Sequence, residues 1–270
     1  MKREKEVPIV PSQRSLGWVP DLPDHRDVLY SAPIELLKDM PPAIDLRPQC
    51  PKTVYDQGHL GSCTANAIAG AMEFDQLRQK QAPATPSRLF IYYNERKMEH
   101  HIQTDSGAQI RDGIKSVVKL GACPETLWPY DDTGPKTEGD PCPTCKFAQE
   151  PSADCYTEAL KHQALNYSRI SHALALMKGC LASGFPFVYG FTVYENFPFD
   201  TKTGDIPMPT GSVIGGHAVL AVGYDDSKQT FIFRNSWGPV WGCGGYGFMP
   251  YAYLTDSNLS DDLWTIRTIE

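Results

Sequence analysis

The sequence has no block of lysine or arginine residues, and its charges sum to a negative value. It holds 25 Lys and Arg against 32 Asp and Glu, a formal net charge of −7. Nucleic acids and anionic membranes are bound mainly through clustered positive charge. We therefore expect neither as a partner of this chain.

Long apolar runs are also missing, and no window approaches the length of a transmembrane helix. The first ten residues begin with positive charge, but Glu4, Glu6 and Pro8 interrupt the stretch where a signal peptide needs an apolar core. This leaves a cytoplasmic location or a non-standard export route open. Repeats and low-complexity segments are lacking, and 41% hydrophobic with 21% charged residues is an ordinary globular composition.

The chain divides into a proline-rich stretch over residues 1–41 and a packed domain over residues 42–270. We expect the first to be an extended arm on the surface of the second. Helical spacing dominates the first half of the domain and strand patterns the second, which predicts an α+β protein with two unlike lobes. The expected helices are 63–79, 85–98, 108–121 and 171–182, and an apolar run follows at 185–193. The expected strands are 216–224, 230–237, 245–250 and 262–269. Thr85 is the expected cap of the second helix, and residues 130–155 are expected to form a long loop.

Cys63 stands where a glycine turn runs into the first helix, in the stretch "DQGHLGSCTANAIA". The unpaired amides and positive end of a helix N-terminus favour a thiolate. Most cysteines in such a place are buried or bridged, so a catalytic role requires a base and a group that orients it.

His217 and Asn235 supply a candidate pair, because they lie at equal distances from the turn "DDSK" between two expected strands. A hairpin about that turn would place them directly opposite each other, with Cβ atoms ~4.5–5.5 Å apart. The amide oxygen could then hold one imidazole nitrogen and leave the other for the thiol. A core histidine beside a structural asparagine is the alternative.

Gln57 lies six residues before Cys63. Its side-chain NH2, together with the backbone N–H of Cys63, could stabilise an anionic carbonyl oxygen. Without the other three residues, Gln57 would be interpreted as a surface amide.

Together these residues resemble the papain-like cysteine peptidases, in the order Gln, Cys, His, Asn. The matching stretches are "DQGHLGSCTANAIA", "GGHAVLAVGY" and "IFRNSWGPVWGCGGYGFM", with "PAIDLRP" and "ETLWPYDD" as further matches. They span about residues 42 to 250, and within the family the chain is most similar to a bacterial branch. The resemblance implies a two-lobe fold, a helical lobe and an antiparallel sheet lobe, with the active-site cleft between them.

The resemblance also implies a role for each catalytic residue. Cys63 is then the nucleophile of a thiolate–imidazolium pair with His217, Asn235 orients the imidazole, and Gln57 completes the oxyanion hole. Trp237 matches the indole that covers the His–Asn hydrogen bond, although a core tryptophan is the plainer interpretation.

Three glycines are expected to meet the substrate. Gly107, in "DSGAQ", occupies the place of the family's glycine segment that pairs with substrate backbone. Gly190 and Gly215 are expected to border the main specificity pocket, where small residues would leave it roomy.

Two positions depart from the family. Leu60 replaces a customary cysteine and Thr64 a customary aromatic residue, so the usual disulfide pattern cannot be assumed. Cys180 is expected to be a buried free thiol. Since residues 1–41 differ from the family's longer helical propeptide, we hypothesise that they bind near or across the cleft and restrict access.

Several alternatives stay open. A zinc site is conceivable from four residues, against a disulfide-stapled or free-thiol loop: Cys142, Cys145, Cys155 and His162. His100 and His101 could grip a terminal carboxylate or simply end a helix in solvent. The enzyme could be an acyltransferase or transglutaminase, and the domain could be an inactive binding module. We expect a monomeric cysteine peptidase, an endopeptidase acting on peptides or proteins, with no cofactor and no metal.

Overall fold

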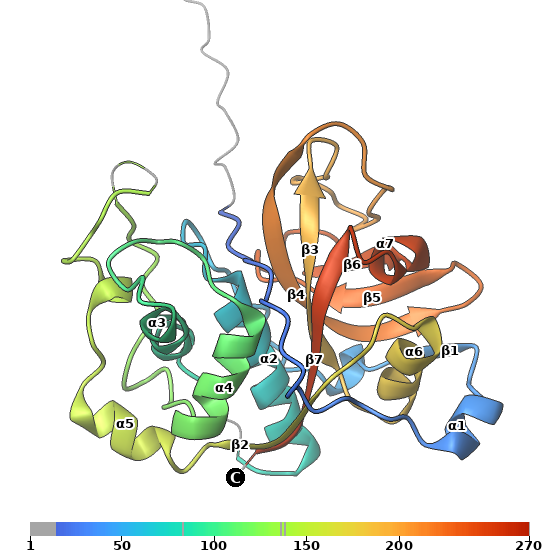
Figure 1. Ribbon diagram of the computed structural model, residues 1–270, viewed down its shortest axis with the longest axis horizontal. Coiled ribbons are helices and arrows are strands. Elements are labelled where there is room, and N and C mark those ends of the chain that lie inside the picture. The colour runs from blue at the N-terminus through green and yellow to red at the C-terminus, as the bar shows by residue number, and fades with distance from the viewer. Residues whose placement is uncertain (1–14, 83, 136, 138, 270) are drawn as a thin grey trace, which may run out of the picture.

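The computed structural model describes residues 15–82, 84–135, 137 and 139–269. Figure 1 shows a helical lobe beside a sheet lobe, the α+β arrangement expected from the sequence. The helices are α1 (Ile34–Lys38), α2 (Cys63–Arg78), α3 (Arg88–Met98), α4 (Ile110–Leu120), α5 (Ala153–Ala159), α6 (Leu174–Ala182) and α7 (Tyr251–Thr255). The strands are β1 (Ala43–Asp45), β2 (Ala164–Arg169), β3 (Phe187–Tyr194), β4 (Val213–Asp225), β5 (Thr230–Arg234), β6 (Tyr246–Pro250) and β7 (Ser260–Ile269).

Helix α2 is the central element, and its first fourteen residues, Cys63 to Gln76, are buried. Small side chains let it approach the sheet: a Cβ added at Gly70 would lie 3.6 Å from a methyl group of Leu220 on β4. Because α2 packs against α3 and α4 and also against strands of the sheet, the helix lies where the two lobes meet.

Helix α3 begins later than the sequence predicted. Ser87, not Thr85, is its N-cap, and the Ser87 hydroxyl accepts a hydrogen bond from the Phe90 N–H at 3.1 Å. The preceding Pro86 forms an isolated bridge with Pro124, which keeps it outside the helix. The expected end of α4 at Gly121 is confirmed, with φ at 72°.

One antiparallel sheet carries the second lobe in the strand order β2-β7-β3-β4-β5-β6, with β1 added against β4. The predicted hairpin between β4 and β5 is present, but the exact pairing was wrong. Leu220 pairs with Arg234, and a register shift follows between Ala221 and Gly223. Asn235 therefore lies one residue beyond β5 and reaches His217 through its side chain rather than as a directly paired neighbour.

The long loop over residues 130–155 contains a short 3₁₀ turn at Lys146–Ala148 and leads into α5. Within it Cys142 and Cys145 form a disulfide, which supports the stapled-loop alternative and removes two donors from the conceivable zinc site. In the described ranges no group of three or more His, Cys, Asp or Glu residues is placed to hold a metal ion.

The arm runs between the two lobes from residue 15 onward (Figure 1). Trp18 forms a parallel bridge with Ala108 of the helical lobe, and Leu29 a second one with Arg169 of the sheet lobe. The arm then continues through α1 to β1. In the described part of the chain, no helix combines the length and apolar character needed to cross a membrane.

Candidate active site

Cys63 is the first residue of α2 and is fully buried. The backbone N–H groups of Thr64, Ala218 and Gly17 all contribute hydrogen bonds to its sulfur. Gly17 belongs to the arm, so the arm itself touches the thiol. Burial outweighs these donors and raises the pKa of Cys63 to about 12.

His217 lies on β4 and is held by Asn235, with 2.8 Å between Nε2 and the amide oxygen. Since that oxygen only accepts, Nε2 carries the proton and Nδ1 is left as the second, outward nitrogen. Among the described residues, Nδ1 has no hydrogen-bond partner. Trp237 stacks on the imidazole with ring centroids 4.7 Å apart, which covers the His–Asn pair on one side.

The expected thiolate–imidazolium pair is not the favoured state of this arm-covered form. Burial lowers the pKa of His217 to about 4, while the pKa of Cys63 is raised to about 12. Both shifts favour the neutral thiol and neutral imidazole, because the dry surroundings penalise each charge.

Gln57 is oriented by a residue that sequence reasoning missed. The Ser236 hydroxyl donates to the Gln57 Oε1 at 2.6 Å, which turns Nε2 the other way. That nitrogen donates to the carbonyl oxygens of Ser15 at 3.1 Å and Leu60 at 2.9 Å. Ser236 directly follows Asn235 in the "NSW" stretch, and this position next to a predicted catalytic residue was the one signal in the sequence that could have identified it.

The backbone of the arm forms hydrogen bonds with both lobes next to Cys63. The Trp18 N–H donates to the Gly216 carbonyl at 2.9 Å, on the sheet lobe. On the helical lobe, Val19 N–H donates to the Ala108 carbonyl at 3.1 Å, and Ala108 N–H to the Gly17 carbonyl at 2.8 Å. The cleft between the lobes is therefore filled by the chain's own backbone.

The glycines expected to bind substrate all lie against the arm. A Cβ on Gly190 would lie 2.0 Å from the Trp18 indole, and one on Gly107 2.2 Å from the Gly17 carbonyl oxygen. A Cβ on Gly215 would lie 2.7 Å from a methyl group of Leu16. The absence of side chains at these three positions is what lets the arm lie so deep.

Asp262, on β7, lies beneath Trp18 and was not identified from the sequence. Its carboxylate accepts the indole N–H of Trp18 at 3.1 Å and the backbone N–H of Asp21 at 2.7 Å. No local signal marked Asp21 or Asp262, since Asp21 lies in the proline-rich arm and Asp262 begins the expected strand 262–269.

The departures from the family are buried. Leu60 is fully buried, and Thr64 donates a 2.6 Å hydrogen bond to the buried carboxyl of Glu95. Burial raises the pKa of Glu95 well above its ordinary value. Cys180 is a free, fully buried thiol, as expected.

The remaining predicted positions lie elsewhere. His100 is exposed just past the end of α3, as the helix-end alternative expects. A cavity of about 590 Å³ is lined by residues such as Cys50, Glu73 and Arg78, near the end of α2 opposite Cys63. A second cavity of about 460 Å³ adjoins Ser15 and Leu16, so part of the cleft beside the arm is open.

Comparison with known proteins agrees with this geometry. The profile of the papain family cysteine proteases matches residues 40–258. Xylellain, a cysteine protease from Xylella fastidiosa, is 47% identical, with 97% of this chain and 100% of that chain covered and a TM-score of 0.89. An uncharacterized peptidase C1-like protein of Acanthamoeba polyphaga mimivirus is 40% identical over 95% of this chain and 88% of its own length. Cathepsin B-like CP3 of Giardia intestinalis is 33% identical over 76% of this chain and 68% of its own length.

The chain thus belongs to the papain family of cysteine proteases. It is a cysteine peptidase with the two-lobe papain-like fold, and it acts on peptide or protein substrates. The expected bacterial assignment is supported only in part, because xylellain is bacterial whereas the mimivirus relative is viral. The acyltransferase and inactive-module alternatives are not favoured by these relatives.

Proposed function

We propose that this chain is a cysteine endopeptidase in which Cys63 is the nucleophile, His217 the acid and base, and Asn235 the residue that positions His217. Gln57 and the Cys63 backbone N–H form the oxyanion hole. The observation that carries this assignment is the 2.8 Å His217–Asn235 hydrogen bond, which leaves Nδ1 as the only imidazole nitrogen for the thiol.

The chemistry follows from these positions. His217 Nδ1 takes the proton of the Cys63 thiol, the sulfur attacks the peptide carbonyl carbon, and the negative charge that moves to oxygen is held by the donors of the oxyanion hole. When the C–N bond breaks, His217 gives its proton to the leaving amine. Water then loses a proton to His217, attacks the thioester and releases a carboxylic acid, which returns the thiol–imidazole pair.

We propose further that residues 1–41 form an arm distinct from a peptidase domain over residues 42–270, and that the described part of this arm covers the cleft. The contacts of Gly17 with the Cys63 sulfur and of Ser15 with Gln57 support this role. Moving the arm out would rehydrate Cys63 and His217, and the thiolate–imidazolium pair would become favourable. Gly107, Gly190 and Gly215, which now contact the arm, would then meet the substrate of a monomeric enzyme.

The test is the loss of peptide hydrolysis in Cys63→Ala, measured with Cys243→Ser as a control. Cys243 is a free, exposed thiol, so its loss is expected to leave hydrolysis intact. Hydrolysis by Cys63→Ala at the wild-type rate would overturn the assignment.

A further inference from the structure

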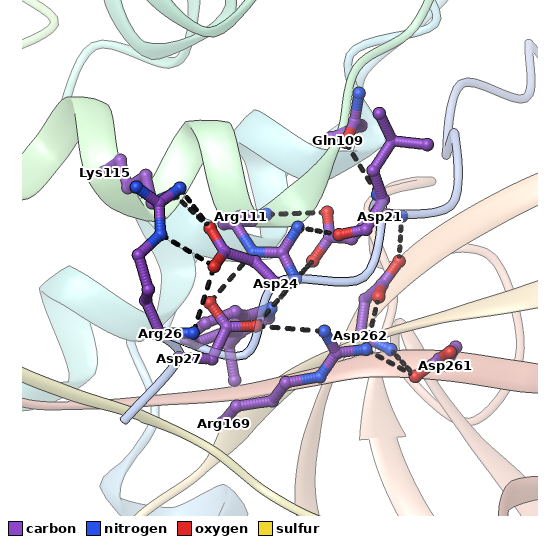
Figure 2. Close-up of polar contacts among 12 residues, drawn as sticks. Asp21, Asp24, Arg26, Asp27, Gln109, Arg111, Lys115, Arg169, Asp261 and Asp262 are labelled. Atoms are coloured by element: carbon purple, nitrogen blue, oxygen red, sulfur yellow. Dashed lines mark hydrogen bonds and ion pairs between the residues drawn. The ribbon is translucent and has the colours of Figure 1, made fainter. Parts of the chain in front are cut away.

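Two buried carboxyl groups lie close together, Asp21 of the arm and Asp262 of the sheet lobe (Figure 2). The side chains of Asp21 and Asp262 both have no exposed surface. The Asp21 backbone N–H donates to the Asp262 carboxylate at 2.7 Å, which holds the two residues beside each other. Two buried carboxyl groups at one site repel each other when both are ionised, so such a pair favours one proton between its members.

Each of the four carboxyl oxygens of the pair also accepts a hydrogen bond from an N–H donor. Asp21 accepts the Arg111 backbone N–H at 3.0 Å on one oxygen and the Trp264 indole N–H at 3.1 Å on the other. Asp262 accepts the Trp18 indole and the Asp21 backbone on Oδ2, and Arg169 at 3.0 Å on Oδ1. The pair therefore joins the arm to both lobes.

Acidic groups outnumber basic ones around this pair. Asp27 of the arm is bound by Arg111 at 2.6 Å and by Arg169 at 3.1 Å, so both arginines are already engaged with a third carboxylate. Arg169 also contacts Asp261 at 2.9 Å. Two cations thus face the three buried carboxyl groups of the pair and Asp27 and the partly exposed one of Asp261, and one retained proton reduces the excess of negative charge.

We propose that the Asp21–Asp262 pair is a proton-dependent catch for the arm: the shared proton holds the arm in the cleft, and its loss at mildly alkaline pH frees the arm. This inference rests on the proposed covering role of the arm and adds its regulation. Opening the catch withdraws Trp18, Gly17 and Ser15 from the cleft together, because they lie within six residues of Asp21 along one strand-like segment.

The direction of the pH dependence follows from the number of protons that the closed and open forms bind. Burial, and then the charge of Asp21, raise the pKa of Asp262 to about 8, and burial also raises the pKa of Asp21. An arm in water would return Asp21 to an ordinary carboxyl pKa near ~4. The closed form therefore holds one more proton than the open form, and its advantage falls by up to about tenfold for each unit of pH rise until that proton is lost, near pH 8.

Charged groups on each packed element bear on this pair. They are Arg111 and Asp112 of α4, Glu99 after α3, Arg169 of β2, Asp261 of β7 and Asp27 of the arm. The acidic members of this set add to the repulsion when the shared proton leaves. The positive charges of Arg111 and Arg169 reduce this repulsion, but both arginines also pair with Asp27.

The test compares full-length wild type with Asp21→Asn, whose amide N–H replaces the shared proton at every pH. Asp24→Asn is the matched control, since it removes another arm carboxylate that pairs with Arg26 and Lys115 instead. The readout is amide hydrogen exchange in residues 15–22, corrected for intrinsic rates, between about pH 6 and about pH 9. Peptide hydrolysis is recorded in parallel.

We expect exchange of the arm to rise at least about tenfold over this range in wild type and in Asp24→Asn, and to stay level in Asp21→Asn. Equal pH dependence in Asp21→Asn and wild type would overturn the catch. So would an Asp21→Asn arm that is open at every pH, because the amide then fails to replace the proton. An arm that opens as expected without any hydrolysis appearing would contradict the proposed peptidase roles and leave the catch standing.

Discussion

Gln57 donates a hydrogen bond from Nε2 to the carbonyl oxygen of Ser15 at 3.1 Å, across 42 residues of sequence. The amide assigned to the oxyanion hole thus holds a carbonyl group of the arm. Trp18 lies on Gly190 three residues later, so one short segment occupies both the proposed catalytic position and the proposed specificity pocket.

Replacing Trp18 by Ala is expected to release the arm from the cleft. Removing a buried Trp side chain costs about 3–5 kcal/mol, which would shift the closing equilibrium by roughly 10²–10⁴-fold. Hydrolysis of a fluorogenic peptide by the full-length chain should therefore rise. Leu22→Ala is the control, because Leu22 is 72% exposed on the same arm and should leave the rate unchanged. A Trp18→Ala rate equal to wild type would contradict the covering role.

Gln57→Ala is expected to lower kcat by about 10²–10³-fold with little change in KM, since its NH2 would act only on the developing oxyanion. Gln57→Ala should be compared with unchanged Gln57 in chains that also carry Trp18→Ala, because the arm is then not expected to limit the rate. Ser236→Ala should give a smaller loss in the same direction, because Ser236 orients the Gln57 amide through a 2.6 Å hydrogen bond. A change confined to KM would assign Gln57 to substrate binding instead.

Asn235→Ala should leave a reduced but measurable rate. The His217 N–H would lose its buried acceptor at a cost of about 1–3 kcal/mol, equivalent to a roughly 5- to 150-fold fall in kcat/KM. His217→Ala should be far more damaging, with a loss of roughly 10⁴-fold or more. If Asn235→Ala were as inactive as His217→Ala, Asn235 would have to do more than position the imidazole.

The ionisation of Cys63 should depend on the arm. In the covered form, burial raises the pKa of the thiol to about 12 and lowers that of His217 to about 4, so both groups stay neutral near neutral pH. Thiolate ultraviolet absorbance at neutral pH should appear in Trp18→Ala and be absent from the Cys63 site of wild type. Equal absorbance in the two chains would mean that arm contact does not set the protonation state.

The sequence was a good guide to the lobes and to the residues near Cys63, because helical spacing and the "NSW" and "GGHAV" stretches are local patterns. The start of α3 was wrong because the Pro86–Pro124 bridge competes with the helix. The His217–Asn235 register was wrong because a shift between Ala221 and Gly223 cannot be read from symmetry about a turn.

The Asp21–Asp262 pair could not be predicted at all. The two residues are 241 positions apart, and each becomes buried only when the arm lies between β7 and α4. Their chemistry depends on a tertiary contact, and neither the arm sequence around Asp21 nor the strand sequence after Asp262 carries a sign of it.

The central claim is that Cys63 is the nucleophile and that the arm covers it. It is tested most directly by labelling with an epoxide that traps active thiols, followed by peptide mapping, on full-length wild type and on Trp18→Ala under reducing conditions. The account predicts that the label falls on Cys63 and not on the exposed Cys243, and that it forms roughly 10²-fold or more faster in Trp18→Ala. Labelling at another cysteine, or at Cys63 with equal rates in both chains, would contradict it.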